Sequence, residues 1–145
     1  MAVTRTMGYQ FLTEEALGEH DLNATDTILI CLMKTTFTFN PATHSTYADI
    51  SADEIATGYG YTQKTKVLTT GVTETATGAT VSSNNPSWTA SGDDLPAVGS
   101  AIVINDSHAN DTVICCIDFG ADYTTADGTV FQIDFTNGLF TKANS

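Results

Sequence analysis

Residues 112–120 read Thr-Val-Ile-Cys-Cys-Ile-Asp-Phe-Gly, and this stretch decides the fold class. Side chains alternate between the two faces of a β-strand, so the stretch divides into two sets. One set is wholly apolar and consists of Val113, Cys115, Ile117 and Phe119. The other set is mixed and consists of Thr112, Ile114, Cys116 and Asp118. The pattern predicts a strand whose first face lies in a core.

The chain around this strand predicts an antiparallel meander. The segments expected to pair in sequence order are 101–104, 112–120, 130–135 and 139–140. The turn signals Asp127-Gly128 and Asn137-Gly138 would reverse the chain between the later segments. The C-terminal third is therefore expected to form one sheet.

The first half of the chain also reads as strands separated by turn residues. The candidates are residues 27–33, 36–39, 66–70 and 72–81. Helical periodicity is limited to Thr13–Gly18 and a turn after Ser51, which forms a capping-box pattern with Glu54. We therefore expect an all-β fold, an antiparallel β-sandwich or barrel with one or two short helices. The β-rich domain would span residues 21–145, and residues 1–20 would form an extended N-terminal arm.

Charge limits the partners that the chain can have. Among 145 residues, 5 are Lys or Arg and 17 are Asp or Glu, for a formal net charge of -12. Such a chain repels nucleic acids and anionic membrane surfaces, so neither is an expected partner. No Lys or Arg occurs between Val67 and Thr141, which argues against a phosphate-handling enzyme. No apolar run is longer than Ile28–Met33, so no membrane span is expected.

The three cysteines are an odd number without CxxC spacing. They predict free, buried thiols in a protein made in a reducing cytosol. Cys115 and Cys116 are adjacent in a strand, so their side chains should point to opposite faces. Ile114 and Cys116 make the second face partly apolar, so either this chain or another subunit should cover it.

The sequence predicts no catalytic, cofactor or metal site. Asp106-Ser107-His108 contains the groups of a catalytic triad, but adjacent side chains diverge and triads assemble from distant segments. His20 and His44 lack the spacing of metal-binding motifs. Residues 21–26 and 118–127 contain aspartates that suit calcium, yet neither fits the EF-hand template, and turn capping is the expected role.

Several motifs follow one another in an order that resembles a known family. They are Gly60-Tyr61-Thr62, Lys66-Val67-Leu68, Trp88-Thr89-Ala90, AVGSAIVINDS at 97–107, TVICCIDFG at 112–120 and GTVFQIDFTNGLF at 128–140. This order resembles small virion structural proteins of tailed bacteriophages, known as head decoration or cement proteins. The resemblance covers roughly residues 45–142 and includes no catalytic residue. Cys115-Cys116 and Gln63-Lys64 depart from the family pattern, which affects surface contacts rather than the fold.

The resemblance implies a structural, non-enzymatic protein on the exterior of the virion head, synthesised in the host cytoplasm. Its partners would be the major capsid protein and itself, because such proteins often form trimers, and an apolar second sheet face would also favour a homotrimer. The expected partner-interface residues are Tyr9, Phe11, Leu12 and Trp88. The alternative is a receptor- or glycan-binding module of a head or tail fibre, with Trp88 and the tyrosines as stacking surfaces. A third hypothesis, a hydrolase built on Asp106-Ser107-His108, would need Ser107 for activity.

Overall fold

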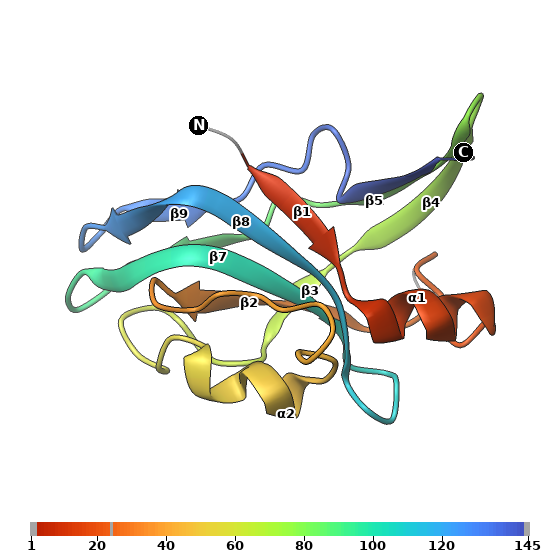
Figure 1. Cartoon of the computed structure of the whole chain (residues 1–145). Helices are drawn as coiled ribbons and strands as arrows, with labels where there is room; N and C mark the ends of the chain where they lie inside the picture. The colour runs from red at the N-terminus through yellow and green to blue at the C-terminus, as the bar shows by residue number, and fades with distance from the viewer. Residues whose placement is uncertain (1–2, 24, 144–145) are drawn as a thin grey trace.

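The computed structural model describes residues 3–23 and 25–143 and consists mainly of antiparallel strands (Figure 1). The elements are β1 (Thr4–Met7), α1 (Tyr9–Ala16), β2 (Ile28–Lys34), α2 (Tyr47–Ile50), a 3-10 helix (Ser51–Asp53), β3 (Lys66–Leu68), β4 (Thr70–Thr75), β5 (Gly78–Ser83), β6 (Ser87–Thr89), β7 (Leu95–Asn105), β8 (Thr112–Thr125), β9 (Val130–Gln132) and β10 (Phe140–Ala143). No helix in these two ranges is long and apolar enough to cross a membrane.

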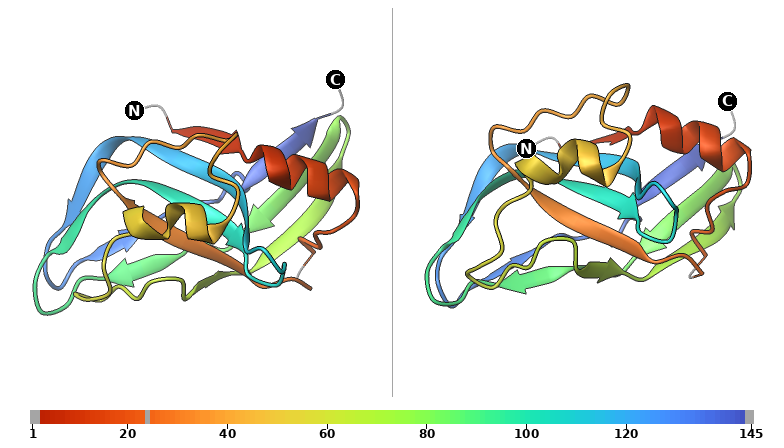
Figure 2. Two further views of the ribbon diagram at one scale, coloured as in Figure 1. Left: turned by 60° about the horizontal axis from the view of Figure 1, so that its bottom comes forward. Right: turned by 90° about the horizontal axis from the view of Figure 1, so that it is seen from below.

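Three antiparallel sheets build the fold. The largest has five strands in the order β1-β8-β7-β2-β3, and the others have the orders β10-β5-β4 and β6-β9. The two smaller sheets lie across one face of the large sheet (Figure 2). The expected all-β, sandwich-like architecture with two short helices is therefore confirmed.

A β-bulge in β8 changes which side chains share a face. Val103 pairs with Cys115, but the next residue, Ile104, pairs with Val113, so Ile114 is the extra residue. Cys115, Ile117 and Phe119 lie in the expected core, and Cys116 lies on the opposite face. The prediction is wrong for two residues, because the bulge turns Val113 to the second face and Ile114 to the first.

The large sheet separates two apolar cores. The larger core lies toward the small sheets and contains Trp88, Phe119 and Phe140. The smaller core contains Cys31, Ile102 and Cys116, and Ile50 of α2 covers it together with the partly buried Phe37, Phe39 and Tyr47. This chain therefore covers both faces of its own sheet. Phe37 and Phe39 belong to that cover, which is why residues 36–39 form a loop and not the expected strand.

The expected C-terminal meander is only partly present. The β7-β8 hairpin forms as predicted, but β9 pairs with β6 and β10 pairs with β5. The β6-β9 pair places Trp88 opposite Phe131, so that the buried Trp88 ring and the partly buried Phe131 ring pack against the larger core. The turn residues predicted the reversals correctly but carried no information about the layer that each strand joins. Residues 72–81 also differ from expectation, because they form the facing strands of the β4-β5 hairpin.

The N-terminal segment does not extend away from the domain as an arm. β1 pairs with β8, and α1 follows it and buries Phe11 completely. The helix begins at Tyr9, four residues before the expected start, because Phe11 and Glu14 share its buried face. The core therefore includes Phe11, from the segment that the sequence predicted to be a separate arm.

Candidate functional site

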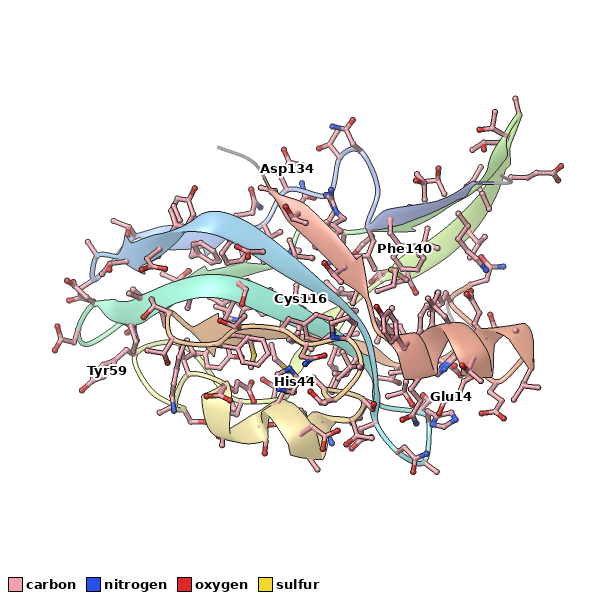
Figure 3. All side chains as sticks on the ribbon, in the orientation of Figure 1. Glu14, His44, Tyr59, Cys116, Asp134 and Phe140 are labelled. Atoms are coloured by element: carbon pink, nitrogen blue, oxygen red, sulfur yellow. The ribbon has the colours of Figure 1, made fainter. Side chains whose placement is uncertain are left out.

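Four acidic and imidazole side chains meet where α1 packs beside the turn that joins β7 and β8 (Figure 3). We call Glu14, Glu19, His20 and His108 the histidine–glutamate cluster. Gly18 makes it possible, because its φ of 77° closes the helix: the Gly18 N–H donates to the Glu15 carbonyl and the Glu19 N–H to the Glu14 carbonyl, both at 3.0 Å. The chain then turns back and places His20 beside Glu14.

The distances in the cluster are those of hydrogen bonds and close ion pairs. His20 Nε2 lies 2.9 Å from Glu14 Oε2, and His108 Nε2 lies 3.8 Å from the same oxygen and 3.1 Å from Glu19 Oε2. The His20 side chain is fully buried, whereas 43% of the Glu19 side chain is exposed. The cluster is therefore a partly buried polar site that is open on the Glu19 side.

Asn105 determines the position of the His20 proton. Its Oδ1 accepts the Ser107 N–H at 2.9 Å, so its Nδ2 must be the atom that contacts Asp26 Oδ2 at 2.7 Å and His20 Nδ1 at 2.9 Å. An amide nitrogen only donates, so His20 Nδ1 is the acceptor. The ring proton of His20 consequently lies on Nε2 and is donated to Glu14.

Glu14, His20 and His108 are the only group of three potential metal ligands that meet within the described residues. Two imidazoles and a carboxylate suit zinc. To bind a metal through Nε2, however, His20 would have to move its proton to Nδ1, where a metal-bound histidine needs a hydrogen-bond acceptor. Asn105 presents a donor there. The arrangement therefore fits a hydrogen-bonded cluster better than a metal centre.

The surroundings of Glu14 stabilise its charged form. Burial alone would raise the pKa of this carboxyl, but hydrogen bonds from Gln10, Thr112 and His20 outweigh burial, and His108 adds a smaller electrostatic contribution. The result is a pKa below the usual range. Thr112 contributes through its hydroxyl, which donates to Glu14 Oε2 at 2.7 Å.

We expect Glu14 to make the fold sensitive to acid. Because the folded-state pKa is depressed, its contribution is complete above the unfolded pKa of about 4.3 and is lost as the pH falls through the folded pKa. Glu14→Gln should therefore be less stable than wild type at pH 7, and the difference should shrink at pH 3 in urea unfolding. The control is Glu74→Gln, which changes an exposed carboxylate on β4. A Glu14→Gln difference that stays constant with pH would contradict the assignment.

A second polar centre surrounds Glu54, whose exposed fraction is 1%. The Tyr47 hydroxyl donates to Oε2 and the Tyr61 hydroxyl to Oε1, each at 2.5 Å, and the Lys64 N–H donates to Oε1 at 2.9 Å. The Tyr61 oxygen in turn accepts the Leu32 N–H of β2 at 2.9 Å. The carboxylate thus ties α2 and the 54–64 loop to the large sheet. The capping box expected between Ser51 and Glu54 does not form, because Thr46 and Asp49 cap α2 and Glu54 points inward.

Burial is the main cause of raised pKa values around Glu54. It raises the pKa of Tyr47, of Tyr61 and of the Cys31 thiol, and the Glu54 carboxylate adds to the effect at all three. These groups consequently keep their protons, and the two tyrosines remain hydrogen-bond donors to the carboxylate. All three cysteines are free and buried, as expected.

The structure divides the four expected interface residues into two pairs. Tyr9 and Leu12 are 59% and 46% exposed on α1, so they remain available to a partner. Phe11 and Trp88 are 0% and 4% exposed and belong to the larger core, so that part of the prediction is wrong. Trp88 packs against Tyr61 and Phe131, which leaves it unable to serve as a stacking surface for sugars.

The sequence motif Asp106-Ser107-His108 does not form a triad. Asp106 pairs with Lys64 at 3.1 Å, Ser107 accepts the Thr27 N–H at 2.7 Å, and His108 joins the histidine–glutamate cluster. Two of the aspartates in the acidic segments cap local turns, as expected: Asp21 accepts the Asn23 N–H and Asp118 the Gly120 N–H. Asp127 instead accepts the N–H of the distant Gly92.

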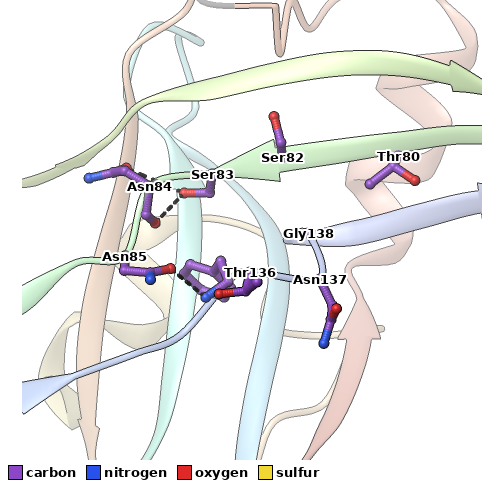
Figure 4. A pocket seen from close by; sticks show the side chains of 9 residues that line it. Thr80, Ser82, Ser83, Asn84, Asn85, Thr136, Asn137 and Gly138 are labelled. Atoms are coloured by element: carbon purple, nitrogen blue, oxygen red, sulfur yellow. Dashed lines mark hydrogen bonds between the residues drawn. The ribbon is translucent and has the colours of Figure 1, made fainter.

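Among the surface hollows of the described residues, two have similar volumes. One, of about 490 Å³, lies beside β5 and is lined by hydroxyl and amide side chains, including Ser82, Asn85 and Asn137 (Figure 4). Asn85 already accepts the Phe135 N–H at 2.6 Å there. The other, of about 470 Å³, is mainly apolar and lies between β1, β8 and β9.

No family model, curated protein or solved structure matches the chain.

Proposed function

We propose that the protein is a capsid decoration protein, which binds the outer surface of a tailed-phage head and stabilises contacts between major capsid subunits. The resemblance in motif order carries the proposal. Its segments correspond to the turn at Gly60, β3, β6, β7, β8 and the chain from β9 to β10. They contribute most of the larger core, including Trp88, Val103, Ile117 and Phe135. The resemblance is thus one of folding pattern and does not depend on a chemical site.

The distribution of charge supports a partner that offers cations. Lys34 donates to the Ala52 carbonyl, Lys64 pairs with two aspartates, Lys66 lies over the Trp88 ring and Lys142 pairs with Glu15. These contacts occupy four of the five cationic side chains, while most acidic side chains face solvent. Such a surface favours a protein partner over nucleic acid. In this proposal the protein performs no chemistry and is made in the host cytoplasm before it joins the virion exterior.

The proposed homotrimer now depends on the family resemblance alone. The apolar second face, which had favoured self-association, is covered within the chain by α2 and the loop before it. Tyr9 and Leu12 are exposed apolar side chains near the β1 end of the large sheet and could contribute to contacts with capsid subunits.

We expect the purified protein to bind empty, expanded heads of the phage that encodes it and to raise the temperature at which these heads break. Co-sedimentation measures binding, and cryo-electron microscopy locates the added density. Isolated tails from the same phage are the control. Density at regular positions on the head shell would support the proposal. Density on tails or fibres only, or no binding, would contradict it and favour the receptor-binding alternative.

A further inference from the structure

β1 is an edge strand with unpaired backbone groups. Its partner β8 lies on one side, and the Gly8 N–H donates to the Ile114 carbonyl at 2.9 Å. Thr6 pairs with Cys116 in the same register. Backbone groups alternate in direction along an antiparallel strand, so the N–H and C=O groups of Arg5 and Met7 point away from β8. They are positioned to bond to a further strand.

A cleft lies along this free edge. The hollow of about 470 Å³ is lined by Val3, Arg5, Phe119, Val130 and Phe131. Val3 and Val130 are 50% and 58% exposed. A second hollow of about 270 Å³ continues between Arg5 and Met7 on one side and Phe140 on the other. Arg5 lines both hollows, so together they form a channel along β1, with the chain from β9 to β10 on its other side.

Arg5 gives this channel a specific charge. It is the only cationic side chain of the described residues without an ion pair, hydrogen bond or aromatic ring contact, although the chain has a net charge of -12. It lines both hollows. Asp134 also lines the larger hollow, but it accepts the Thr136 N–H at 2.8 Å and forms no ion pair with Arg5. An unpaired guanidinium beside the apolar side chains of Phe119 and Val130 favours a ligand with a carboxylate next to an apolar side chain.

We propose that an extended, carboxylate-bearing segment of the major capsid protein adds to β1 as a further strand in this channel. Its backbone bonds to Arg5 and Met7, its apolar side chain fills the cleft against Val130, and its carboxylate pairs with Arg5. This inference rests on the proposed function, because it names the surface through which the protein would bind the head.

Three variants that each make the net charge more negative by one unit test the surface. Arg5→Gln and Val130→Asp change the channel, whereas Val67→Asp is the matched control, because Val67 is 52% exposed on β3, the opposite edge of the same sheet. In co-sedimentation with empty, expanded heads, we expect the channel variants to bind about tenfold more weakly or worse than wild type. Val67→Asp should bind within about twofold of wild type.

Hydrogen exchange provides a second readout. On binding to heads, the Arg5 and Met7 amides should exchange more slowly, while the Thr6 amide, already directed toward β8, should change little. Equal binding of all three variants while wild type binds would overturn the docking surface and leave the proposed function standing. Wild type that fails to bind heads would overturn both. If Val130→Asp dissociates a self-associated form of the protein but binds heads as well as wild type, the channel binds a second copy of this chain. That result would overturn the inference.

Discussion

Gly60→Ala is expected to lower the free energy of unfolding by more than about 4 kcal/mol. Gly58 and Tyr61 exchange backbone hydrogen bonds of 2.8 and 3.0 Å, and Tyr59 and Gly60 between them have φ values of 53° and 91°. Two positive φ values are typical of a tight I′ hairpin turn. A Cβ at Gly60 would lie 1.9 Å from the Thr89 carbonyl oxygen, a backbone atom that β6 holds in place. Urea unfolding followed by the fluorescence of the single tryptophan measures the loss.

Gly92→Ala separates the cost of the positive φ from the cost of the clash with the Thr89 carbonyl oxygen. Gly92 has a φ of 88°, nearly that of Gly60, but no atom lies within 4 Å of the position of an added Cβ. We expect this variant to lose only about 1 kcal/mol, the usual cost of a left-handed alanine. Similar losses in both variants would show that backbone conformation alone matters, and that the approach to Thr89 does not.

Glu54→Ala is expected to destabilise the fold by about 3–5 kcal/mol, because it leaves the buried Tyr61 hydroxyl, the partly buried Tyr47 hydroxyl and the Lys64 N–H without their acceptor. Tyr47→Phe is the control, since it removes one donor and leaves Glu54 with Tyr61 and Lys64. Its expected loss is about 1–2 kcal/mol. Thermal and urea unfolding compare the two. A loss for Tyr47→Phe as large as that for Glu54→Ala would mean that the Tyr47 hydrogen bond alone, and not the carboxylate with its three donors, holds this region.

The Glu54 centre should also limit the stability of the fold at alkaline pH. The raised pKa values of Tyr47 and Tyr61 mean that the folded state keeps protons that the unfolded chain releases near pH 10. Stability is therefore complete below about pH 10 and falls as the pH rises above it. Glu54→Gln removes the negative charge beside both hydroxyls, so its stability should fall less steeply over this range.

Local patterns predicted the parts of the fold that depend on neighbouring residues. The alternation in 112–120 predicted β8, and the intervening polar loop predicted its hairpin with β7. The bulge at Ile114 was not predicted, because it depends on the register with Ile104 and on a second core that needs Val113. The layer that β9 joins was also not predictable, because a turn signal reverses the chain without selecting a partner strand.

The histidine–glutamate cluster and the Glu54 centre could not be predicted from the sequence for a similar reason. Glu14 and Thr112 are 98 positions apart, and no spacing rule connects them. One local signal was present: Glu14 follows Phe11 by three residues on one helix face, so burial of the aromatic ring draws the carboxylate inward as well. Glu54 offered only its misleading capping-box position, because the two tyrosines that hold it lie in α2 and after the turn at Gly60, and no sequence spacing connects them with the carboxylate.

The neighbouring cysteines of β8 give the chain a chemical reporter for each of its two cores. Cys115 lies in the larger core and Cys116 in the smaller, and burial raises the pKa of each to about 12. Both thiols are therefore inert while the sheet is closed, and one peptide bond separates them. A difference between their alkylation rates measures opening on one side of the sheet alone, whereas equal rates identify a single cooperative unit.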